Sequence, residues 1–209
     1  MIRSLIWLLF FPAGPAQATQ DAWPALYDVH GVAQGDRLNI RERDSSNAPV
    51  IGALAPDARD IELIRPNDRH TWALINTGEG RGWVSLAYMT RQPGQWLGAL
   101  PPLAQCFGTE PFWSLRFEAA DRVSLATPEI DRLEGRITAR LGSLSRRDHH
   151  ALLFETRGTA VLSQQITALV TGGDCIDGMS DRAFGLEIDM IADFGSGPAL
   201  HSGCCWLAP

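Results

Sequence analysis

The chain has 209 residues, a formal net charge of −6 and 45% hydrophobic residues. That hydrophobic share is ordinary for a globular protein, so we expect a packed core and exclude a disordered chain. The acidic balance removes any broad electrostatic reason to bind nucleic acid or anionic lipid, so neither is an expected partner. The length allows one large domain or two small ones.

Residues 1–18 are predicted to be a signal peptide. Arg3 supplies a positive charge, Leu5 to Phe11 is an unbroken apolar run, and Ala16-Gln17-Ala18 matches an A-x-A cleavage pattern. The run is far shorter than the roughly 20 residues that a membrane-spanning helix needs. No second long apolar segment follows. We therefore expect a secreted, periplasmic protein without a membrane span in its mature chain.

Residues 25–90 are predicted to form a small β domain. Short segments of strand character, among them Arg37 to Arg41 and Val50 to Leu54, follow one another at close spacing. The residues between them, Asp44 to Pro49, are of types that favour turns. The Gly-containing segment Asn76 to Gly80 predicts a hairpin loop. Several short strands in so few residues favour a small barrel.

The same segment resembles bacterial SH3 (SH3b) domains. Residues 38–41 (LNIR) and 50–54 (VIGAL) are similar to the LNVR and VIG.L words of that family. Residues 72–75 (WALI), 82–84 (GWV) and 88–89 (YM) are similar to its W..V, GWV and YL ending. The resemblance covers nearly the whole segment and implies an SH3-like small barrel.

Aromatic and basic residues of this segment are candidates for ligand contact. In a small barrel such aromatic residues either fill the core or stand beside polar loops, where they suit peptide or glycan stacking. The resemblance implies that the loop 41–47 forms one wall of a groove. The pair Glu42-Arg43 departs from the small residues that the family usually has there. The candidate ligand-binding residues are Tyr27, Arg41, Trp72, Trp83 and Tyr88.

Residues 91–103 are predicted to be a Pro- and Gly-rich linker, and residues 104–209 a second β domain. Trp113, Leu115 and Phe117 alternate with polar neighbours, and the same period recurs over 137–141 and 184–190. This is the pattern of half-buried antiparallel strands. Residues 152–156 and 159–162 are a further candidate hairpin, and 160–170 fits a strand or a short helix. The predicted fold class is all-β: an SH3-like small barrel followed by a disulfide-bonded antiparallel β domain.

All four cysteines lie in the second domain: Cys106, Cys175, Cys204 and Cys205. An even number in an exported protein predicts disulfides. A bond between the adjacent Cys204 and Cys205 would close a strained ring, so each is expected to pair with Cys106 or Cys175. The spacing is not C-x-x-C and no His cluster lies nearby, so we expect neither a redox nor a metal-binding role.

The second domain contains two specific sequence motifs. Residues 106–113 read CFGTEPFW and residues 175–182 read CIDGMSDR. Together with Gly203-Cys204 they resemble an uncharacterised family of bacterial envelope proteins, over about residues 104–206. The resemblance implies an envelope location, the pairs Cys175–Cys204 and Cys106–Cys205, and no established reaction.

The candidate functional residues of these motifs are Glu110, Trp113, Asp177, Asp181 and Arg182. In a structural interpretation, Glu110 accepts backbone or arginine hydrogen bonds, with Arg182 as one donor, and pins two loops together. In a catalytic interpretation, Glu110 and Asp177 or Asp181 form the carboxylate pair that glycan hydrolysis needs. The aspartate spacing is not that of a calcium loop, so we expect no metal, and we expect no cofactor.

We therefore expect a non-catalytic binding protein whose SH3b-like domain binds a cell-wall ligand such as peptidoglycan, or an envelope protein. One alternative is a cell-envelope hydrolase built on Glu110 and Asp177, which an acidic cleft without an arginine neighbour would favour. Another is an inhibitor or assembly factor for a second envelope protein, which a large exposed apolar patch would favour.

Overall fold

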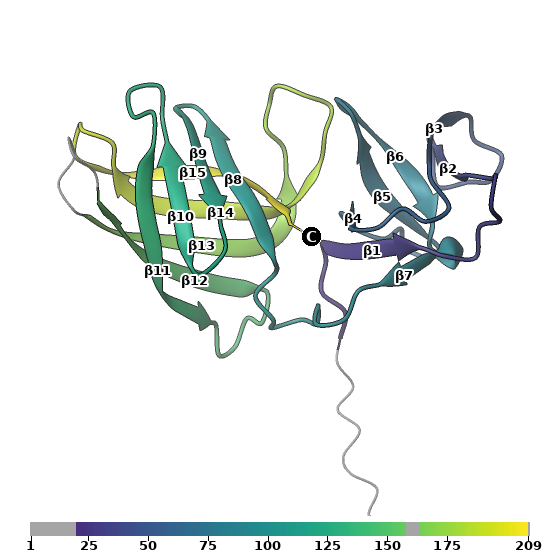
Figure 1. The fold of residues 1–209 in the computed structure, drawn as a ribbon, viewed down its shortest axis with the longest axis horizontal. Helices are drawn as coiled ribbons and strands as arrows, with labels where there is room; N and C mark the ends of the chain where they lie inside the picture. The colour runs from purple at the N-terminus through teal and green to yellow at the C-terminus, as the bar shows by residue number, and fades with distance from the viewer. Residues whose placement is uncertain (1–19, 158–163, 209) are drawn as a thin grey trace, which may run out of the picture.

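The computed structural model describes residues 20–157 and 164–208 (Figure 1). These residues confirm the all-β class, since their one helical element is the short 3-10 turn η1, Leu86–Tyr88. The signal-peptide prediction and the predicted strand 159–162 lie outside the described residues.

Two small antiparallel sheets build the N-terminal part. One has the order β4-β1-β7, with bounds Ile61–Leu63, Ala25–Val29 and Met89–Arg91. The other has the order β3-β2-β6-β5, with bounds Val50–Leu54, Leu38–Arg41, Gly80–Ser85 and Trp72–Thr77. Both sheets pack on one apolar core that includes Val29, Leu63 and Val84. The alternation of β2 turns Leu38 and Ile40 inward and leaves Arg41 at the surface.

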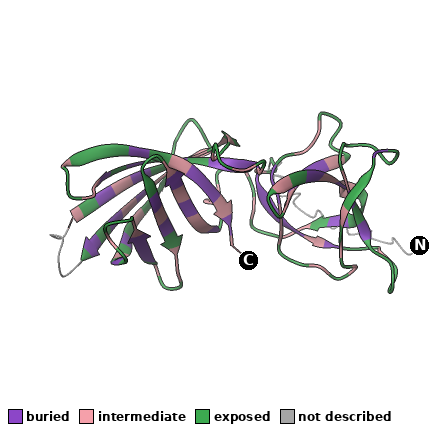
Figure 2. Ribbon diagram, turned by 90° about the horizontal axis from the view of Figure 1, so that it is seen from above, coloured by how far each residue is buried: buried purple, intermediate pink, exposed green. Residues whose placement is uncertain are grey.

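The C-terminal part is a closed barrel of eight antiparallel strands in the order β10-β11-β12-β13-β14-β15-β8-β9. Their bounds are Leu103–Thr109 (β8), Phe112–Phe117 (β9), Arg122–Ala126 (β10), Leu133–Gly142 (β11), His149–Arg157 (β12), Gln164–Cys175 (β13), Phe184–Asp193 (β14) and Pro198–Leu207 (β15). Figure 2 shows buried and exposed residues alternating along the barrel strands. Closure through the β15–β8 pair leaves the barrel no free edge.

The segment 160–170, which fitted a strand or a helix, is a strand where it is described. Within β13, Ile166, Ala168 and Val170 are buried and their neighbours are more exposed. This period of two pairs β13 with β12 and β14 and places its apolar side chains in the barrel core.

Two disulfides join the strands of the barrel. Cys106 on β8 bonds to its direct partner Cys205 on β15, inside the core. Cys175, the last residue of β13, bonds to Cys204, with 5.7 Å between the Cα atoms. Because successive side chains of a strand point to opposite faces, the second bond lies on the outer side of the barrel. Both pairs are those that the family resemblance implied.

The two parts contact each other side by side (Figure 1). The amide of Asn76 donates to the Ala183 carbonyl at 2.8 Å, and the Ala183 N–H donates back to Asn76 Oδ1 at 3.0 Å. An apolar cluster of Ile64, Leu74 and Ala183, with Trp83 packed against it, lies beside these bonds. The segment 176–183 is therefore held against the N-terminal part.

Candidate functional site

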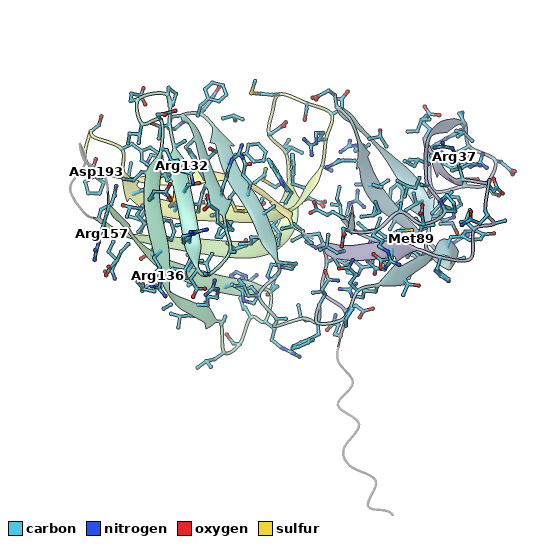
Figure 3. The ribbon with its side chains drawn as sticks, viewed as in Figure 1. Arg37, Met89, Arg132, Arg136, Arg157 and Asp193 are labelled. Carbon is cyan, nitrogen blue, oxygen red and sulfur yellow. A yellow bond between two sulfur atoms is a disulfide. The ribbon has the colours of Figure 1, made fainter. Side chains whose placement is uncertain are left out.

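A groove of about 520 Å³ on the N-terminal part brings together three of the five candidate ligand-binding residues. Arg41, Trp72 and Tyr88 line it, with Asp36 and Arg37 among their neighbours. We call it the N-terminal groove. Arg37 lies at the outer end of the molecule, away from the barrel (Figure 3). The groove thus offers aromatic rings, two arginines and one carboxylate to a ligand.

Local hydrogen bonds position the lining residues of the N-terminal groove. Arg41 ends β2, and its guanidinium donates to the Ala48 carbonyl at 2.8 Å, which closes the loop between β2 and β3. Trp72 begins β5, and its N–H donates to Asn67 Oδ1 at 3.2 Å. Tyr88 ends η1 and is 44% exposed, so its ring is open to a ligand.

The other two candidates, Tyr27 and Trp83, lie outside this groove. Tyr27 is 6% exposed and belongs to the core, where its hydroxyl accepts a hydrogen bond from Arg91 at 2.8 Å. Burial raises the pKa of Tyr27, against the opposing charge of Arg91. Trp83 packs at the contact with the barrel, and the Arg65 guanidinium lies 5.7 Å from its ring centroid. We leave both out of the candidate site.

A larger groove, of about 820 Å³, lies on the outer side of the barrel. Its walls are the turn between β8 and β9 and the loop 176–179, and its floor includes parts of β14 and β15. We call it the barrel groove. It contains two of the candidate carboxylates, Glu110 and Asp177, and two that the sequence analysis did not single out, Glu187 and Asp189. Buried and exposed residues alternate along β14, and this alternation in the sequence could have identified Glu187 and Asp189 as outward-facing.

Asp177 holds its own loop together. Its carboxylate accepts hydrogen bonds from the Met179 N–H at 3.0 Å, the Ser180 N–H at 2.9 Å and the Ser180 hydroxyl at 2.8 Å. Desolvation acts to raise the pKa of Asp177, but these hydrogen bonds and the charge of Arg182 outweigh it and hold the pKa below its ordinary value. Gly178 has φ +70°, which suits glycine in this tight turn.

The two loops are pinned by a contact other than the expected one between Glu110 and Arg182. The Thr109 hydroxyl donates to the Asp177 carbonyl at 3.1 Å. Glu110 is exposed, so its carboxylate is open to solvent. The Arg182 guanidinium instead lies over the rings of Phe184 and Trp206, 5.2 and 5.9 Å from their centroids. Arg182 does not line the groove, although its charge acts on Asp177.

Trp113 and Asp181 also lie outside the carboxylate cluster. Trp113 is buried inside the barrel, where its indole lies against Gly108 and Gly203. A Cβ on Gly203 would stand 2.9 Å from the Trp113 ring, so glycine makes room for the indole. Asp181 is exposed, and its backbone N–H donates to the Glu79 carbonyl at 3.1 Å. These two residues support the fold and the contact between the two parts.

The barrel groove meets one condition of the hydrolase alternative, but Asp177 does not suit the role of general acid. Glu110 and Asp177 share the groove, and its lining includes no arginine, as that alternative requires. A general acid, however, needs a carboxyl group whose pKa is raised. The pKa of Asp177 is lowered, whereas Glu62, whose pKa burial raises, lies at the contact between the two parts.

Comparisons with known proteins found no match to any family model, curated protein or solved structure. Across residues 20–157 and 164–208, no three His, Cys, Asp or Glu residues gather so as to hold a metal ion. No helix within the same residues is long and apolar enough to cross a membrane. The two grooves are the candidate ligand sites of the molecule.

Proposed function

We propose that this is an exported, periplasmic, non-catalytic binding protein whose N-terminal groove binds peptidoglycan. The observation that carries the proposal is the convergence of Trp72, Tyr88 and Arg41 on one open groove. The SH3b resemblance of residues 25–90 agrees with a ligand-binding role for this part. The disulfides suit an oxidising compartment, which agrees with the signal-peptide prediction.

The chemistry of the groove suits a wall fragment. Aromatic faces stack on the apolar faces of sugar rings, and Tyr88 presents its ring at the surface. Stem peptides carry carboxylates, for which the guanidinium of Arg37 is a suitable partner. Asp36 accepts a hydrogen bond from the Arg37 backbone N–H at 2.7 Å. Its negative charge would repel a ligand that placed a carboxylate beside it.

Co-sedimentation of residues 19–209 with purified peptidoglycan sacculi tests the proposal. We expect the wild-type protein to pellet, and Tyr88→Ala to weaken binding about tenfold, as loss of a central aromatic contact does. Arg37→Ala should weaken binding and reduce its salt dependence. The matched control is Trp96→Ala, because Trp96 is 45% exposed, as Tyr88 is, and does not line the groove.

Two results would contradict the proposal. The first is a wild-type protein that stays in the supernatant at every sacculus concentration. The second is an equal loss of binding in Tyr88→Ala and Trp96→Ala, which would place the contact outside the N-terminal groove. Thermal unfolding of each variant shows whether lost binding reflects lost structure.

A further inference from the structure

The side chains that line the barrel groove carry a net negative charge. Four carboxylates line it, from Glu110, Asp177, Glu187 and Asp189, and its lining includes no lysine or arginine. Arg182, which follows the loop 176–179, lies over the rings of Phe184 and Trp206 and does not line the groove. A concave site lined by one sign of charge concentrates ligands of the opposite sign.

Large apolar side chains surround the same groove. Phe112, the first residue of β9, is 55% exposed, and Ile176 and Met179 on the loop 176–179 are 72% and 69% exposed. All three line the groove. A second hollow, of about 560 Å³, adjoins the first and shares Phe112 and Met179. Large exposed apolar residues that gather in one place are typical of a surface that binds another protein.

The walls of the groove are held in place before any ligand arrives. The Cys175–Cys204 disulfide fixes the start of the 176–179 loop, and the Asp177 carboxylate closes its turn. The Thr109 hydroxyl ties this loop to the β8–β9 turn. On the floor, Asp189 accepts the Ser202 hydroxyl at 2.6 Å. A preorganised surface loses little conformational entropy on binding.

We infer that the barrel groove docks a segment of a partner protein that presents arginine or lysine side chains between apolar ones. The carboxylates receive the cationic groups, and Phe112, Ile176 and Met179 cover the apolar ones. Within the described chain the carboxylates do not converge as metal ligands, and they come from three different segments of the groove lining, which suits separate cationic groups. The inference is independent of wall binding, because the N-terminal groove shares no residue with this one.

Nuclear magnetic resonance titration of residues 19–209 tests this inference. The probe is a blocked hexapeptide of alternating leucine and arginine, and its control carries uncharged citrulline in place of each arginine. We expect the arginine peptide to shift the amide signals of residues 107–112, 176–179 and 187–189, and the citrulline peptide to leave them unchanged. Tyr88→Ala should bind the arginine peptide as the wild type does.

Charge variants sharpen the test. The double variant Glu187→Gln with Asp189→Asn should raise the dissociation constant about tenfold, the sum of two exposed ion pairs. The matched control is Glu155→Gln, since Glu155 is exposed on the barrel strand β12 and does not line the groove. Amide spectra of the variants report whether they keep the wild-type fold.

The inference is overturned if the arginine peptide shifts no groove signal up to about 1 mM, where even weak complexes form. It is also overturned if both peptides bind equally, because charge would then play no part. If Glu155→Gln loses as much binding free energy per removed charge as the double variant does, the peptide is attracted by the overall negative charge alone.

Discussion

At the scale of single residues, Glu62 places a carboxylate at the contact between the two parts. The Leu207 N–H donates to its Oε2 at 3.3 Å, while Oε1 is buried and has no partner among the described residues. Burial raises the pKa of Glu62 from 4.5 to about 7, against the Leu207 hydrogen bond and the charge of Arg182. The folded protein therefore holds this proton more tightly than the unfolded chain does.

This difference makes stability depend on pH. The contribution of Glu62 is fully present below about pH 4.5 and is lost as the pH rises to about 7, because the folded state binds more protons in that window. The expected loss is about 3 kcal/mol in the free energy of unfolding. The stability of Glu62→Gln should depend little on pH in this range, so the variant should be more stable than the wild type at pH 8.

Urea unfolding at pH 5 and pH 8 measures this effect. Glu155→Gln, which changes an exposed carboxylate of the barrel, is the control and should follow the wild type at both pH values. A wild-type protein whose stability changes between the two pH values no more than that of Glu62→Gln would refute the prediction.

At the scale of the strand, Gly203 lets β15 lie close to β8 and to the Trp113 ring. A Cβ at this position would stand 2.7 Å from the carbonyl carbon of Phe107 and 2.9 Å from Trp113. The first of these atoms belongs to the backbone of a paired strand and has little freedom to move. Gly203→Ala should therefore lower the free energy of unfolding by about 3 kcal/mol.

A second barrel glycine provides the comparison for Gly203. In Gly172→Ala on β13, the nearest atom to the new Cβ is the Trp23 carbonyl oxygen at 3.6 Å, an ordinary contact. Gly172→Ala should change the free energy of unfolding by no more than about 0.5 kcal/mol. Urea midpoints of the two variants measure the difference, and equal midpoints would show that β15 can shift to accept the methyl group.

The same strands show what the sequence could and could not predict. The strands with clean alternation, such as 113–117 and 184–190, were predicted because one face meets the core and the other meets solvent. Strands β8 and β15 were missed because parts of their outer faces are covered as well. Phe107 packs on Phe184 and Trp206, and Cys204 is buried in its disulfide.

The candidate sites, like the strands, were only partly predictable from the sequence. The sequence supplied Arg41, Trp72 and Tyr88, which the fold brings into one groove. It could not separate them from Tyr27, because an aromatic residue of a small barrel faces the core or the solvent according to strand register. The outward direction of Glu187 was readable from its strand, but the loop 176–179 that walls it in is a tertiary contact.

At the scale of the whole molecule, the segment 176–183 serves both parts. Its first half walls the barrel groove and is held by the Cys175–Cys204 disulfide and the turn of Asp177. Its second half reaches the N-terminal part through Ala183, which exchanges two hydrogen bonds with the side chain of Asn76. One segment therefore links a rigid groove wall to the contact that orients the two grooves.

Asn76→Ala should loosen this contact while leaving the barrel groove intact. Two part-buried hydrogen bonds are lost, which costs about 2 kcal/mol of docking free energy. Because the Ala183 N–H donates directly to Asn76 Oδ1, its hydrogen exchange should accelerate about 30-fold, the rate equivalent of that free energy. Asn47→Ala, in an exposed loop of the same part, should leave the exchange of Ala183 unchanged.

The arginine peptide should bind Asn76→Ala as it binds the wild type, since Asp177 and the disulfide still hold the groove wall. Unchanged exchange at Ala183 in Asn76→Ala would show that the apolar cluster of Ile64, Leu74 and Trp83 holds the two parts together without these bonds.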